Sequence, residues 1–170
     1  MNTGLPFSAI LDAVDRRLDT GFDTEANTGV LSVADRQLAE GEQVLETYLR
    51  GQGREPTHDL HEGFRLLALH RQAARGDSGF NACRETCREL VFLRNSLAMD
   101  QGDAVETARI LRMQSMVLRH LALFVGGRMV EAGLGEFCCS SRPLRQSGAA
   151  APVLSRPDAP KPPSPALGDL

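Results

Sequence analysis

Cys83 and Cys87 lie four residues apart in a charged segment, and this pair is the strongest candidate for chemistry in the chain. Side chains at positions i and i+4 of an α-helix project from the same face, so both thiolates could bind one metal ion such as zinc, copper or iron. Cys83 would also lie in the first turns of its helix, where the helix dipole lowers the pKa of a thiol. The pair therefore predicts a metal centre or a thiol redox site as one alternative.

Further ligands for such a centre would have to come from other parts of the chain, because a structural zinc site takes four. The candidates are His70, at the edge of an apolar helical face, and the adjacent Cys138 and Cys139. The spacing of the four cysteines does not match the C-x₂-C pairs of zinc ribbons. We therefore predict no cofactor from spacing alone, and the metal site depends on these residues meeting in space.

The other interpretation of Cys83 and Cys87 is structural. At about 100° per residue, both cysteines share a helical sector with Phe80, Leu90 and Val91. Free cysteine behaves as a small hydrophobic residue and is among the residues most often buried. On this interpretation the two cysteines belong to the core, and the charged residues between them face solvent.

Arginines supply two candidate surfaces for binding a partner. Arg84 and Arg88 flank the cysteine pair, and Arg112 and Arg119 form a stripe on the last predicted helix. The net charge of −3 argues against a general nucleic-acid binder, which needs a basic face. We therefore expect a protein partner, and a DNA-binding transcriptional regulator remains an alternative.

Motifs for the common enzyme classes are absent from the sequence. The glycine pairs near the end of the last predicted helix do not form a nucleotide-binding fingerprint, and neither G-x-S-x-G nor H-E-x-x-H occurs. A triad assembled in space stays open, but the spacing gives it no support. The sequence therefore favours a protein without catalysis.

The elements that would position these residues are predicted to be helices, because apolar residues recur with the helical period through most of the chain. We predict an all-α, single-domain bundle of about five helices at residues 1–145, followed by a disordered Pro- and Ala-rich tail at 146–170. The last helix is the most apolar and should lie in the middle of the bundle. Counting the capping residues, the helices are expected at about 7–19, 31–49, 57–74, 77–99 and 103–132.

The first residues of the chain and its hydropathy indicate where in the cell the protein is expected. The first residues have no basic segment typical of a signal peptide, and no apolar run is long enough to cross a bilayer. We therefore expect a cytoplasmic protein with reduced cysteines. The leading hypothesis is a small, non-catalytic, regulatory helical protein that acts through an unidentified protein partner, with a homodimer also open.

Overall fold

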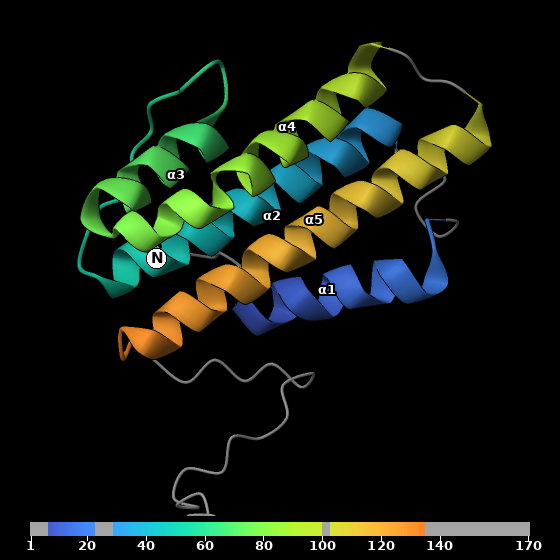
Figure 1. Ribbon diagram of the computed structural model, residues 1–170. Helices are drawn as coiled ribbons and strands as arrows, with labels where there is room; N and C mark the ends of the chain where they lie inside the picture. The colour runs from blue at the N-terminus through green and yellow to red at the C-terminus, as the bar shows by residue number, and fades with distance from the viewer. Residues whose placement is uncertain (1–6, 23–28, 100–102, 135–170) are drawn as a thin grey trace, which may run out of the picture.

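The computed structural model describes residues 7–22, 29–99 and 103–134, most of which lie in helices (Figure 1). The predicted all-α bundle of five helices is confirmed for this part of the chain, in which no strand forms. The predicted tail at 146–170 and the cysteines at 138 and 139 lie outside the described residues. The helices are α1 (Phe7–Thr20), α2 (Val30–Gly51), α3 (Arg65–Gly76), α4 (Arg84–Met99) and α5 (Ala104–Glu131), and a 3₁₀ helix, η2 (Ser78–Cys83), precedes α4.

The α5 helix lies in the middle of the bundle, as its apolar sequence predicts. It packs against α1 on one side and against α2 and α4 on the other, and α3 lies against α2 and the start of α4 (Figure 1). Leu118, Leu121 and Val125 of α5 are fully buried between these helices. A helix with this many apolar side chains is stable only when several neighbours cover it.

A close approach of α2 to its neighbours explains Gly41 in the middle of that helix. A Cβ at this position would lie 3.2 Å from Cδ1 of Leu66 and 3.6 Å from Cδ1 of Leu118. Glycine costs about 1 kcal/mol relative to alanine inside a helix, so its presence reflects the tight packing of α2 on α3 and α5.

The start of the third helix differs from the prediction. Helix α3 begins at Arg65, not near Thr57, because Glu62 and Gly63 both have positive φ angles and form a tight turn that brings His61 opposite Phe64. The Thr57 hydroxyl, expected to cap the helix, accepts a hydrogen bond from the backbone N–H two residues later instead. Gly63 was the signal for this turn, since glycine readily takes a positive φ.

Asp77 fixes the start of the segment that carries the cysteines. Its carboxylate accepts a hydrogen bond from the backbone N–H of Gly79, so it caps η2 as an Asp at this position predicts. The same carboxylate accepts from the Tyr48 hydroxyl at 3.0 Å and pairs with the Arg128 guanidinium. Asp77 therefore ties η2 to the C-terminal halves of α2 and α5.

None of the helices in the described ranges is long and apolar enough to span a membrane.

Candidate functional site

Cys83 and Cys87 lie in the core at the junction of η2 and α4. Cys83 is 1% exposed and Cys87 is fully buried, and both thiols are free. They pack in the main apolar cluster with Phe80 and Leu90. This is the environment that the structural interpretation of the pair predicts.

His70 of α3 adds a polar group beside this pair, as its position on the helix face allows. His70 Nε2 lies 2.8 Å from the carbonyl oxygen of Phe80, and the Cys83 thiol lies 3.3 Å from the same oxygen. A hydrogen bond from the Cys87 thiol, helped by His70 and opposed by burial, lowers the pKa of Cys83 to about 6. That bond to Cys83, together with burial, raises the pKa of Cys87 well above its usual range.

The charge of His70 responds to the same contacts. Burial favours the neutral imidazole, but the hydrogen bonds to Cys83 and to the Phe80 carbonyl outweigh it, so the pKa of His70 is raised. The structure thus brings a thiol of lowered pKa against an imidazole of raised pKa.

The predicted metal centre has no complete set of ligands within the ranges described. No three His, Cys, Asp or Glu side chains there form a group that could hold a metal ion, although His70, Cys83 and Cys87 lie near one another. Cys138 and Cys139, the other predicted ligands, fall outside those ranges. The thiol redox alternative meets a geometric obstacle, because Cβ atoms at helical i and i+4 positions lie about 5–6 Å apart. A disulfide needs roughly 3.5–4.5 Å, so the backbone at the junction of η2 and α4 would have to shift to form one.

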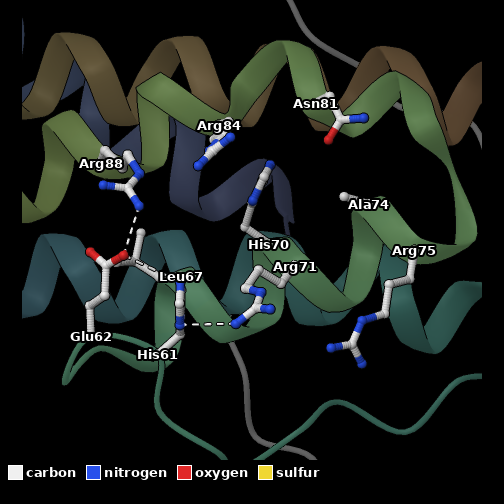
Figure 2. Close-up of a pocket in the computed structure, with 10 residues that line it drawn as sticks. All are labelled: His61, Glu62, Leu67, His70, Arg71, Ala74, Arg75, Asn81, Arg84 and Arg88. Carbon is white, nitrogen blue, oxygen red and sulfur yellow. Dashed lines mark hydrogen bonds and ion pairs between the residues drawn. The ribbon is translucent and has the colours of Figure 1, made fainter.

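A pocket of about 600 Å³ opens between α3 and the segment formed by η2 and α4 (Figure 2). Arg71 and Arg75 lie one turn apart on α3, and Arg84 and Arg88 lie one turn apart on α4. His70 rises from α3 toward the start of α4, so this buried imidazole forms part of the wall. We call this cavity the arginine pocket; its lining residues are His61, Glu62, Leu67, His70, Arg71, Ala74, Arg75, Asn81, Arg84 and Arg88.

Two of the four arginines in this pocket are already engaged. Arg88 Nη2 lies 2.7 Å from a Glu62 carboxylate oxygen, and Arg71 Nη1 lies 3.0 Å from Nδ1 of His61 (Figure 2). Arg75 and Arg84 are exposed and form no hydrogen bond or ion pair with any other residue that the structure describes. Their guanidinium groups are available to a ligand.

The second predicted surface, the stripe of Arg112 and Arg119, is covered in part by α1. Arg112 Nη1 donates to the backbone carbonyl of Leu18 at 2.9 Å, and Arg119 Nε lies 2.6 Å from a carboxylate oxygen of Asp15. These contacts hold α1 against α5. Of the two predicted arginine surfaces, the one at Arg84 and Arg88 therefore keeps one guanidinium, that of Arg84, free for a partner.

Sequence reasoning found Arg84, Arg88 and His70 but missed Arg71 and Arg75 as part of the same pocket. The signal in the sequence was their spacing of four residues in a predicted helix, which places both on one face. That spacing could not show which helix this face meets.

Comparison of the chain with protein-family models, with curated proteins and with solved structures finds no match.

Proposed function

We propose that this chain is a non-catalytic helical protein that binds an acidic segment of a protein partner in the arginine pocket. The observation that carries the proposal is the convergence on one cavity of four arginines and His70 from α3 and α4, together with His61 from the turn before α3, against a single carboxylate, Glu62. Arginine stays protonated at any ordinary pH, and its planar guanidinium binds a carboxylate through two parallel hydrogen bonds.

The charge of the pocket contrasts with that of the whole chain, which supports a specific role for it. The chain has a net charge of −3, yet the pocket concentrates positive charge. A concave surface lined by one sign of charge attracts ligands of the opposite sign and speeds their association. A protein that holds one segment of a partner without changing it acts by occupying or positioning that partner, which is a regulatory role.

Arg84→Ala is the sharpest test, because Arg84 is exposed and has no partner to lose among the residues that the structure describes. An exposed ion pair contributes up to about 1 kcal/mol, which corresponds to roughly a fivefold change in affinity. We expect a fluorescently labelled hexaglutamate peptide to bind the full chain in an anisotropy titration, more weakly at high salt. Arg84→Ala should weaken this binding about fivefold, and Arg84→Glu should weaken it further.

Arg16→Ala is the matched control, since Arg16 is an exposed arginine on α1, a helix that contacts α5 and α2. It should leave peptide binding unchanged. Absence of any binding of hexaglutamate, or equal loss of affinity in Arg16→Ala and Arg84→Ala, would refute the proposal. Tighter binding of a duplex DNA probe than of the peptide, lost in Arg84→Ala, would favour the DNA-binding alternative.

A further inference from the structure

A second cavity of about 430 Å³ continues the arginine pocket along α4. It shares Glu62, Leu67 and Arg88 with that pocket, so the two cavities adjoin at the ion pair of Arg88 with Glu62, and together we call them the groove. We call the second cavity the distal pocket; its remaining lining residues are Glu85, Glu89, Val91, Phe92 and Asn95.

The sign of the charge reverses between the two halves of this groove. The distal pocket is lined by three glutamates and one arginine, and that Arg88 is already paired with Glu62 at the boundary. Glu85 and Glu89 lie one turn apart on α4, and neither forms a hydrogen bond or ion pair with another residue of the described ranges. A ligand that fills the whole groove therefore contacts free guanidinium groups in the arginine pocket and free carboxylates in the distal pocket.

Phe92 gives the distal half an apolar contact. Phe92 is 62% exposed, although Val91 beside it and Leu67 across the groove are buried. Single exposed apolar side chains are common on protein surfaces, but this one lies at the wall of a cavity next to unpaired charges. An aromatic side chain in such a place is suited to contact an apolar residue of a bound segment.

We infer that the groove binds a partner segment with acidic side chains at one end and an apolar side chain next to a basic one at the other. This inference rests on the proposed function and adds the order of charges along the partner. Arg84 and Phe92 are eight residues apart on α4, a rise of about 12 Å. An extended segment covers roughly 3.3 Å per residue, so about four residues separate its acidic and apolar positions.

Charge complementarity points to another protein as the occupant and not to the chain's own C-terminal segment. Residues 146–170 contain only two acidic residues, Asp158 and Asp169, and these are eleven positions apart. They cannot both reach the arginine pocket as one cluster at the spacing that the groove requires. A partner segment with clustered acidic residues fits better.

Three labelled peptides test the order of charges. The first peptide carries three glutamates and, four residues further on, a leucine followed by a lysine. The second peptide has glycine and glutamine in place of the leucine and lysine. The third peptide places the leucine and lysine directly after the glutamates. One apolar contact and one exposed ion pair together correspond to about a tenfold gain in affinity. We expect the first peptide to bind the full chain about tenfold more tightly than the other two.

Two variants of exposed residues, Glu85→Gln and Phe92→Ala, test which side chains of the protein cause the tighter binding of the first peptide. Each should reduce binding of the first peptide about three- to fivefold, and neither should change binding of the second. Met116→Ala, which truncates another exposed apolar side chain on α5, is the control and should have no effect. Circular dichroism should show unchanged helix content in all three variants.

The outcomes separate this inference from the proposed function. If the peptides bind with equal affinity and depend on Arg84 but not on Phe92, the order of charges is wrong and the arginine pocket stands. If no peptide depends on Arg84, both proposals fail. Dependence on Arg84, Glu85 and Phe92 for the first peptide alone is the result that supports the groove as described.

Discussion

The ion pair between Arg17 of α1 and Glu40 of α2 leads to the most direct prediction about stability. Both guanidinium nitrogens Nη1 and Nη2 donate to the carboxylate, at 3.0 and 2.5 Å, and the side chains are only 8% and 6% exposed. Arg17 Nε has no hydrogen-bond partner in the structure described. The pair is therefore a buried charge pair with imperfect compensation, which costs desolvation energy and is sensitive to the loss of either partner.

Replacing one partner should be far more damaging than replacing both. Arg17→Met leaves the Glu40 carboxylate buried and unpaired, and Glu40→Leu leaves the Arg17 guanidinium buried and unpaired. Each single variant should therefore lower the free energy of unfolding by about 3–5 kcal/mol. A domain of this size is stable by roughly 5–15 kcal/mol, so the midpoint of thermal unfolding should fall by on the order of 10 °C. The double variant should unfold within about 1 kcal/mol of the parent, or be more stable.

Urea denaturation of the parent, the two single variants and the double variant measures these differences. Arg109→Met provides a surface control, because the pair of Arg109 with Glu106 is exposed to solvent and its loss should leave the free energy of unfolding nearly unchanged. Additive losses in the double variant would refute the reasoning, since they would mean that the two charges do not compensate each other. A loss below about 1 kcal/mol for Arg17→Met would refute it as well, by showing that water reaches the site.

Two further predictions concern the segment that links α3 to α4. The ¹³Cβ chemical shift of Cys83 should titrate near pH 6, below the ordinary thiol pKa of 9.0. Cys87→Ala should move this titration to higher pH, because the hydrogen bond from the Cys87 thiol is the main cause of the lowered pKa. Titration of Cys83 near pH 9 in the parent would contradict this. Since the folded pKa is the lower one, Cys83 stabilises the fold fully above about pH 9 and loses that contribution as the pH falls through about 6. Asp77→Ala should lower the free energy of unfolding by about 1–2 kcal/mol in urea, because η2 loses its cap and the Arg128 guanidinium and the Tyr48 hydroxyl lose their shared acceptor. Asp77→Asn should lower it less, because its amide oxygen still accepts from the Gly79 N–H; equal losses in the two variants would show that the cap does not matter.

Local patterns were sufficient to predict the helices and their central member. The apolar period of α5 predicts its burial, because a helix covered with apolar side chains is stable only among neighbours, and Asp77 and Asp103 cap the segments that they precede. The predicted start of α3, near Thr57, was wrong. Thr57 has the residue type of a helix cap, but the turn with positive φ at Gly63 sets the true boundary. Propensity to cap is a local preference, and tertiary packing can override it.

The sequence alone determined that Cys83 and Cys87 lie on one helical side with apolar neighbours, because the helical period fixes which residues share a face. Only the tertiary structure decided what that side and its flank meet. The packing of α3 beside η2 and α4 brings His70 to the Phe80 carbonyl and sets Arg71 and Arg75 opposite Arg84 and Arg88. The physical reason is that the angle and register between two helices depend on the side chains packed between them, and no repeat along the chain encodes that.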